Sequence, residues 1–263
     1  MKAADARVLL TGAGGGIGRA MADALQAEGA VVLGVGRQGP PSGQGHRPWV
    51  RADLATEAGI AATTAAAEAF GANVVVHAAG VPAFGALESL PPQRLAQVLA
   101  LNLLAPMQLT QALLPALRRQ QQAQIVFVGS ALGRIGLPGF SAYGASKAGL
   151  HGFAEALRRE LADTPVRVQI LGPRSTRTAF NDAGVEAYNR ATGTAMDDPA
   201  VVAAALLALI ESEAAERFIG FPERLGVRLN GVLGARMAGS FARHRRSLAT
   251  VPAAATNPTG EPA

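Results

Sequence analysis

The 263-residue chain has no cysteine, so it forms no disulfide and holds no zinc–thiolate site, iron–sulfur cluster or thiol nucleophile. Only 16% of its residues are charged and 5% are aromatic, whereas 49% are hydrophobic. This composition excludes disorder of the whole chain. A chain of this length buries enough apolar surface to fold without disulfides or structural metals. The lack of cysteine is compatible with a reducing compartment, and we expect a cytoplasmic protein.

Long apolar runs are absent as well. The apolar run Val201–Ile210 has ten residues, about half of what a membrane-spanning helix needs. The N-terminal stretch passes from two basic residues directly into a short apolar run and a glycine loop. A signal peptide has a longer apolar core and a small-residue cleavage site. The sequence therefore predicts neither a membrane span nor a leader.

Lysine is nearly absent, because Lys2 and Lys147 are the only two among 24 basic residues. The sequence pI of about 10.6 would suit a nucleic-acid-binding protein. However, residues 1–222 carry 18 basic and 17 acidic side chains, whereas residues 223–263 carry 6 and 2. The positive charge thus belongs to the C-terminal segment, and no basic stripe interleaved with aromatic residues appears. We expect no nucleic-acid partner.

Short apolar runs alternate with helical patterns through most of the chain. Strands are predicted at 7–10, 30–35, 49–52, 73–77, 124–128, 166–171 and 217–221. Helices are predicted after the first glycine loop to about residue 28 and at 56–70, 92–119, 143–161 and 199–212. Continuously apolar strands separated by helices indicate parallel pairing with both faces covered. Alternating strands and helices of this kind predict a doubly wound α/β sheet with right-handed crossovers.

A glycine-rich loop, Thr11-Gly12-Ala13-Gly14-Gly15-Gly16-Ile17-Gly18, lies between the first predicted strand and helix. Glycines permit a tight turn and close approach to a pyrophosphate, and the helix N-terminus offers free N–H groups with a partial positive charge. A glycine run alone would also fit a flexible turn. The strand–loop–helix context is the one that nucleotide binding requires. We therefore expect a nucleotide at Gly12, Gly14, Gly15, Gly16, Ile17 and Gly18.

The spacing TGxxxGxG differs from the common GxGxxG fingerprint. Ser130 ends a predicted strand, and thirteen residues later the segment Tyr143-Gly144-Ala145-Ser146-Lys147 places its tyrosine and lysine on one helix face. Together these features resemble the short-chain dehydrogenase/reductase family over roughly residues 5–222. The resemblance implies a single Rossmann-like doubly wound domain in which a parallel seven-stranded sheet is flanked by helices.

The resemblance also implies an oxidoreductase that transfers a hydride between a nicotinamide cofactor and a carbonyl or alcohol, such as an aldehyde, ketone or 3-oxoacyl compound. Tyr143 would be the general acid/base and Ser130 would orient the substrate oxygen. Lys147 would bind the nicotinamide ribose and, together with the positive nicotinamide ring, lower the pKa of Tyr143. Asn102, a poor helix former inside a predicted helix, would kink that helix and hold a water in a proton relay. The alternative is a catalytically idle dinucleotide-binding sensor or assembly partner, which would not need these four residues.

Further cofactor contacts follow from the same resemblance. It assigns the adenine contact to Asp53 and Leu54, the turn beside the cofactor to Ala79 and Gly80, and the loop over the nicotinamide to Pro173 and Thr178. From the residues alone, Asp53 also fits a solvated helix start. His77 stands where the family usually has asparagine, and we interpret it as a neutral, hydrogen-bonded histidine. Arg174 replaces a family glycine, and we interpret Arg174 and Arg177 either as solvated charges or as contacts of an anionic cofactor or substrate group.

The residue after the second strand bears on cofactor choice. An acidic residue there would accept the ribose hydroxyls and repel a 2′-phosphate, but this chain has Gly36-Arg37. Because Arg37 suits charge-assisted bonds to a 2′-phosphate, NADP(H) is favoured. The glycine loop itself carries no basic residue, so NAD(H) remains open. We expect no metal site.

The last third of the chain is less specific. The family resemblance implies a substrate lid at about 178–199, for which Phe180, Val185 and Tyr188 are candidate apolar lining residues, and a homo-dimer or homo-tetramer. We expect a basic amphipathic extension at 223–250 and a disordered tail at 251–263. The apolar positions of the extension recur at helical spacing: Leu225, Leu229, Val232, Leu233, Met237 and Phe241. The extension either packs as an oligomer or lid helix, or makes peripheral contact with an anionic membrane through 223–248.

Overall fold

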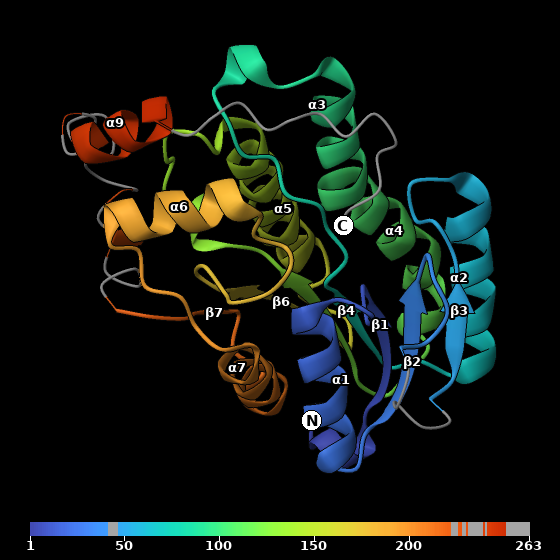
Figure 1. Cartoon of the computed structure of the whole chain (residues 1–263). Coiled ribbons are helices and arrows are strands. Elements are labelled where there is room, and N and C mark those ends of the chain that lie inside the picture. Colours follow the sequence, from blue (N-terminus) through green and yellow to red (C-terminus); the bar gives the residue numbers. More distant parts are fainter. Residues whose placement is uncertain (42–46, 222–225, 228–229, 231–238, 240, 251–263) are drawn as a thin grey trace.

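Seven parallel strands form one sheet in the order β3-β2-β1-β4-β5-β6-β7 in the computed structural model (Figure 1). The structure describes residues 1–41, 47–221, 226–227, 230, 239 and 241–250. The strands are β1 (Arg7–Thr11), β2 (Val31–Gly36), β3 (Trp49–Arg51), β4 (Val74–His77), β5 (Ala123–Val128), β6 (Val166–Gly172) and β7 (Glu216–Phe218). The strand order reverses between β1 and β4, where ligands bind in sheets of this kind. The predicted doubly wound, seven-stranded parallel sheet is confirmed.

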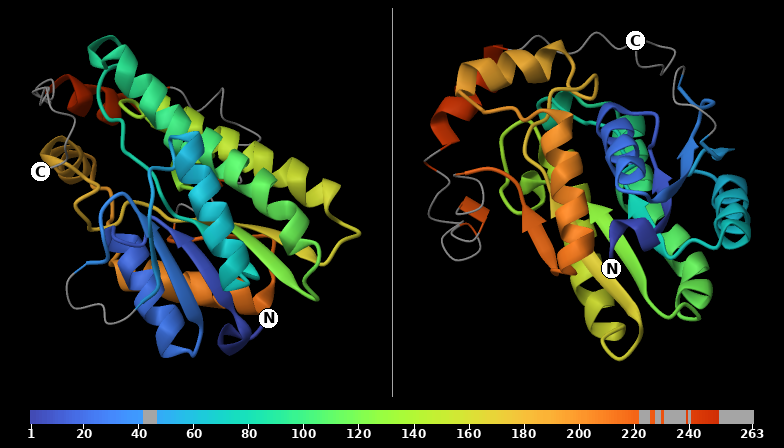
Figure 2. Two further views of the ribbon diagram at one scale, coloured as in Figure 1. Left: turned by 90° about the vertical axis from the view of Figure 1, so that its right-hand side faces the viewer. Right: turned by 90° about the horizontal axis from the view of Figure 1, so that it is seen from below.

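Helices cover both faces of the sheet, as the views in Figure 2 show. One face packs against α1 (Gly16–Ala27) and α7 (Pro199–Ser212). The other packs against α2 (Glu57–Phe70), α4 (Ala105–Leu117) and α5 (Ser141–Glu160). The inner strands are buried on both faces because helices lie above and below them, which explains their unbroken apolar runs such as Val74–Val76.

The α7 helix shows how local sequence sets an element. Asp198 caps its N-terminus by accepting a hydrogen bond from the N–H of Ala200 at 2.9 Å, and Pro199 occupies the first helical position. Both residues are favoured there. The apolar side chains that follow, including the fully buried Leu206 and Leu209, pack against α1 and the sheet. The predicted bounds of this helix, 199–212, are confirmed.

The long helix predicted over 92–119 is interrupted. It consists of α3 (Pro92–Leu99), a π-helical turn η3 (Ala100–Leu104) and α4. Asn102 is buried within the π-helical turn, so the expected local distortion lies where the sequence placed it. By length and composition alone, Pro92–Leu117 is apolar enough to cross a membrane. The same is true of core helices in soluble proteins, and here α4 packs against α2 and α3 against α5.

The predicted lid contains a helix that the sequence analysis did not identify, and the bounds of the last strand need correction. Part of the predicted lid is a helix, α6 (Ala183–Thr192), capped by Asp182 and ended by Gly193 in the left-handed region. Its start and stop signals are present in the sequence, but its mixed polar composition hides the apolar period. The last strand, predicted at 217–221, is β7 at 216–218.

Part of the predicted extension lies outside the described residues. Leu225, Leu229, Val232, Leu233 and Met237 lie outside the described residues, as does the 251–263 tail. The described part that follows them is helix α9 (Ala242–Thr250), which packs against α6 (Figure 1).

We predict that Leu206→Ala destabilises the protein by about 2–5 kcal/mol, because it removes a fully buried side chain from the α1–α7 contact. Val201→Ala on the same helix is the matched control, since Val201 is 45% exposed and its truncation should change stability by less than about 0.5 kcal/mol. Urea denaturation of both variants measures the difference. Equal losses would contradict this account of the core.

Candidate active site

The glycine loop is packed directly against the end of β4. The Thr11 hydroxyl accepts hydrogen bonds from the N–H groups of Ala78 and Ala79 at 3.0 and 3.1 Å. Gly12 has a φ of 68°, and a Cβ atom at this position would lie 2.8 Å from the Ala79 backbone. A Cβ at Gly18 would lie 2.1 Å from the carbonyl oxygen of Gly12. Side chains at these two positions would displace the loop, so glycine is required there by the packing.

The loop is followed by the N-terminus of α1, which begins at Gly16. Thr178, from the loop after β6, contacts it: a Cβ at Gly16 would lie 2.6 Å from the Thr178 methyl group. The glycine loop, the Ala79–Gly80 turn and the Thr178 loop therefore converge at one edge of the sheet. This backbone cradle, with free N–H groups of a helix N-terminus, fits a pyrophosphate.

Helix α5 places Tyr143 and Lys147 one turn apart beside Ser130, which follows β5. Lys147 is buried, and its Nζ donates to the carbonyl oxygen of Val128 at 2.9 Å. The same Nζ lies 5.8 Å from the centroid of the Tyr143 ring. The Ser130 side chain hydrogen-bonds that of Tyr143. The structure thus brings these three predicted residues into one cluster.

The predicted lowering of the Tyr143 pKa is wrong for the protein chain itself. Burial raises the pKa of Tyr143 to about 12, against a smaller lowering by the Ser130 hydrogen bond. Burial also lowers the pKa of Lys147 to about 8. Both shifts have one cause, since the charged form of each group loses its hydration in the packed site. The Lys147 ammonium bonds a backbone carbonyl instead of the phenol oxygen, so it does not offset this loss.

Asn102 lies next to this cluster without bonding to Lys147. Its Oδ1 accepts from the N–H of Val81 at 2.8 Å, and its Nδ2 donates to the Val81 carbonyl at 3.0 Å and to the Ser146 hydroxyl at 3.2 Å. A Cβ at Gly80 would lie 3.0 Å from Asn102 Oδ1 and 3.9 Å from Lys147 Nζ. The turn after β4 is therefore fixed to the π-helical turn, directly beside the lysine.

The interpretation of His77 is confirmed. Its Nε2 hydrogen-bonds the Thr110 hydroxyl at 2.9 Å, and its ring stacks on Phe127 with centroids 4.9 Å apart. Burial lowers the pKa of His77 to about 3, so the imidazole is neutral.

At the opposite end of the cradle, Arg37 is exposed directly after β2. Arg51 at the end of β3 donates from Nε to the Arg37 carbonyl oxygen at 3.1 Å. This second arginine was not among the predicted site residues, because only the register that pairs Gly36 with Arg51 brings it there. Leu54 is buried, whereas Asp53 is exposed and its carboxylate accepts from the N–H of Ala55 at 3.0 Å. Asp53 thus starts the turn before α2.

Neither interpretation of Arg174 is correct. Its guanidinium forms a two-point ion pair with Asp197, with N–O distances of 2.7 and 3.0 Å, and both side chains are largely shielded from solvent. Arg177 is exposed, which agrees with a solvated loop charge. Pro173 is tied to the Ser130 segment, because its carbonyl accepts from the N–H of Ala131 at 3.0 Å. The Arg174–Asp197 ion pair joins the segment just before the predicted lid to the end of that lid.

The three predicted lid residues differ in placement. Phe180 is 37% exposed and meets the Tyr143 ring edge-on, with centroids 6.0 Å apart. Val185 and Tyr188 are buried. The Tyr188 ring packs against Phe84 and Phe140, and its hydroxyl donates to the Pro138 carbonyl at 3.1 Å. Phe180 is thus the one of the three that packs against Tyr143, whereas Tyr188 joins the predicted lid to the segments that carry Phe84 and Phe140.

The C-terminal helix continues this packing. His244 of α9 lies 5.8 Å from the Tyr188 ring, between centroids, and Arg243 Nε donates to the Ala191 carbonyl at 2.9 Å. Helix α9 of the extension therefore rests on α6.

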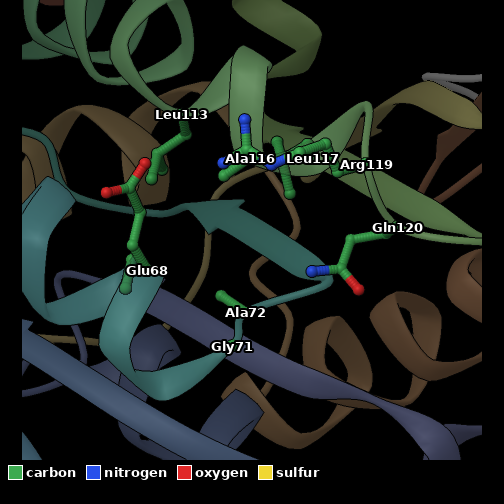
Figure 3. A pocket seen from close by; sticks show the side chains of 9 residues that line it. Glu68, Gly71, Ala72, Leu113, Ala116, Leu117, Arg119 and Gln120 are labelled. Carbon is green, nitrogen blue, oxygen red and sulfur yellow. The ribbon is translucent and has the colours of Figure 1, made fainter.

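A separate pocket lies away from these residues, between α2 and α4 (Figure 3). Its lining includes Glu68, Leu113, Leu117, Arg119 and Gln120, none of which was predicted as a site residue. Within the described ranges, no group of three or more His, Asp or Glu residues is arranged to hold a metal ion.

Comparisons with known proteins agree with the geometry. The family model described as short chain dehydrogenase matches residues 6–189. Dehydrogenase/reductase SDR family member 7B of Mus musculus is 32% identical over 198 residues, 70% of this chain, which spans 61% of that relative's length. The 3-oxoacyl-[acyl-carrier-protein] reductase FabG of Vibrio cholerae is 30% identical over 222 residues, 79% of this chain and 90% of the relative.

Among solved structures, a short-chain dehydrogenase from Streptomyces avermitilis aligns with a TM-score of 0.77 and 28% identity, covering 89% of this chain and 96% of that one. The family match over most of the sequence therefore accompanies a shared fold. The chain belongs to the short-chain dehydrogenase family of NAD(P)-dependent oxidoreductases.

Proposed function

We propose that the protein is an oxidoreductase that transfers a hydride between NADP(H) and a carbonyl or alcohol substrate, with Tyr143 as the general acid/base. The observation that carries this proposal is the cluster of Ser130, Tyr143 and Lys147 beside the glycine cradle. A bound nicotinamide dinucleotide supplies the hydride, and the protein supplies binding and positioning.

The residues of the cradle divide the binding of this cofactor among them. The backbone of Gly12 and residues 14–18 would hold the pyrophosphate, and Asp53 and Leu54 the adenine. Ala79, Gly80 and Lys147 would hold the ribose on the nicotinamide side, with Pro173 and Thr178 covering the ring. The close packing of Gly16 against Thr178 supports this division, because it joins the two loops.

In the direction of reduction, the substrate oxygen gains negative charge and needs a proton. The raised pKa of Tyr143, about 12, keeps its hydroxyl protonated at neutral pH, as a proton donor requires. Ser130 donates a hydrogen bond to the same oxygen and orients it. The Lys147 ammonium favours the phenolate that forms. Asn102 in the π-helical turn would hold a water that links Lys147 to solvent, from which the replacement proton comes.

The lid supports an apolar carbonyl substrate. Phe180 lies edge-on to Tyr143 and forms an apolar wall beside the acid/base. A relative is named as a 3-oxoacyl-[acyl-carrier-protein] reductase, which supports aldehydes, ketones and 3-oxoacyl compounds as the substrate class.

We also propose a cytoplasmic homo-dimer or homo-tetramer. Leu99 and Leu104, near the π-helical turn, are 44% and 50% exposed, and such apolar side chains suit a contact between subunits. Peripheral contact of 223–248 with an anionic membrane is supported by the net positive charge of that segment.

We predict that Tyr143→Phe lowers kcat by about 10²–10⁴-fold, because it removes the proton donor. The affinity for NADPH should change by less than about threefold, which a fluorescence titration measures. Turnover is followed as NADPH oxidation over a panel of aldehydes, ketones and 3-oxoacyl thioesters. Tyr188→Phe removes the other tyrosine hydroxyl and should lower kcat far less. Turnover that survives in Tyr143→Phe would exclude the proposed mechanism.

The pH profile of carbonyl reduction should fall on the alkaline side. Because the pKa of Lys147 is lowered to about 8, the ammonium is present below that pH and is lost above it. Tyr143 stays protonated throughout this range, so the decline of kcat/KM reports the lysine. Lys147→Arg keeps its charge, and its profile should stay flat to pH 10. A flat profile in the unaltered protein would contradict the assignment.

We predict that Arg37→Ala raises the KM for NADPH about 10- to 100-fold, because it removes a charge-assisted hydrogen bond to the 2′-phosphate. The KM for NADH, which lacks this phosphate, should change by less than about threefold. Arg51→Ala tests the neighbouring cation and should raise the KM for NADPH by less than Arg37→Ala does. Equal effects of Arg37→Ala on both cofactors would remove the assignment of NADP(H).

A further inference from the structure

His151 is a buried titratable residue that the proposed mechanism leaves without a role. It lies on α5, four residues after Lys147 and eight after Tyr143, so the three side chains share one face of the helix. The residue is 2% exposed, and its Nε2 lies 3.3 Å from the carbonyl oxygen of Ser130. Its ring stacks on Phe218 of β7, with centroids 5.6 Å apart and planes 5° from parallel.

In the segment after β5, the two positions that face the His151 ring are glycines. A Cβ at Gly129 would lie 2.8 Å from His151 Nε2, and one at Gly133 would lie 2.7 Å from His151 Cδ2. The two glycines flank Ser130 on either side in the sequence. Their missing side chains let the imidazole reach the backbone that carries the Ser130 hydroxyl.

The contact also defines the protonation of the ring. A carbonyl oxygen only accepts, so Nε2 must carry the proton and Nδ1 the lone pair. Nδ1 is buried and has no hydrogen-bond partner among the described residues. Burial, with the nearby charges of Arg134, Lys147 and Arg158, lowers the pKa of His151 to about 4, so the ring stays neutral. A leucine or phenylalanine would fill this space without burying an unpaired nitrogen, so packing alone does not account for a histidine.

We propose that His151 is a positioning residue that holds the Ser130 carbonyl against α5 and thereby directs the Ser130 hydroxyl toward Tyr143. The inference rests on the proposed function, in which Ser130 orients the substrate oxygen. When the His151 contact is included, α5 holds the end of β5 at three points. Tyr143 bonds the Ser130 side chain, Lys147 bonds the Val128 carbonyl, and His151 bonds the Ser130 carbonyl.

The first test needs no substrate, and its result is therefore separate from the fate of the proposed function. Long-range ¹H–¹⁵N NMR of the ¹⁵N-labelled full chain reports the tautomer of each of its four histidines, and the His151 signal is the one that His151→Gln removes. We expect a neutral ring protonated at Nε2 between pH 6 and 8. A ring protonated at Nδ1 would overturn the proposal, because Nε2 would then be unable to donate to Ser130.

The second test is kinetic. His151→Leu should lower kcat about 10- to 100-fold, because the Ser130 hydroxyl is then misplaced. The Kd for NADPH should stay within about threefold of the unaltered value. His151→Gln offers an amide N–H in place of the ring N–H and should restore kcat to within about threefold of the unaltered protein. A glutamine variant no better than the leucine variant would overturn the proposal. The proposal would also be overturned if His151→Leu kept an unaltered kcat while Tyr143→Phe was inactive.

Two further variants separate positioning from stability. Leu150→Ala removes a buried core side chain from the same helix and should lower the melting temperature without lowering kcat below that temperature. Gly129→Ala keeps the histidine in the sequence but adds a methyl group 2.8 Å from Nε2. The ring must then move away from the Ser130 carbonyl, so this variant should reproduce the kcat loss of His151→Leu. If neither His151→Leu nor Gly129→Ala folds, the tautomer measurement on the unaltered chain decides.

Discussion

The contact between α5 and the end of β5 determines where every reactive group of the site lies. A buried ammonium is costly unless it is hydrogen-bonded, and Lys147 meets this requirement through the Val128 carbonyl. That bond fixes the rotation of α5, and because Tyr143 lies one turn earlier on the same face, its ring is fixed as well. Ser130 is two residues beyond Val128, so the strand end and the helix together bring the two hydroxyls into contact.

The sheet order provides the second constraint, since the loops that follow β1, β4, β5 and β6 all leave from the carboxyl edge of the sheet. Direct contacts join the loop after β1 to the loop after β4, and the loop after β5 to the loop after β6. Thr11 accepts from Ala78 and Ala79, and Pro173 accepts from Ala131. A shift of one strand would therefore move several parts of the site at once, and the site is as rigid as the sheet beneath it.

The sequence predicted features that short stretches determine by themselves. Apolar runs mark the strands, Asp198 and Pro199 mark the start of α7, and the YxxxK spacing places Tyr143 beside Lys147. Features that depend on distant residues were missed. Arg174 pairs with Asp197, 23 residues away, and Arg51 meets Arg37 only through strand register. The direction of the Tyr143 pKa shift was also missed, because the shift depends on how deeply the ring is buried and burial follows from packing.

The packing of α9 on α6 shows where part of the C-terminal positive charge lies. Helix α9 exposes Arg243, Arg245 and Arg246 on its surface while it packs on α6 through His244. The lid is held from its other side by the shielded Arg174–Asp197 pair, whose separation would leave a poorly solvated charge on each side. The predicted lid is thus held by the ion pair at its base, by the contacts of Tyr188 with Phe84, Phe140 and the Pro138 carbonyl, and by the contact of α6 with α9. The exposed arginines of α9 therefore lie on the helix that packs against the predicted lid, and this is where the described part of the C-terminal positive charge is found.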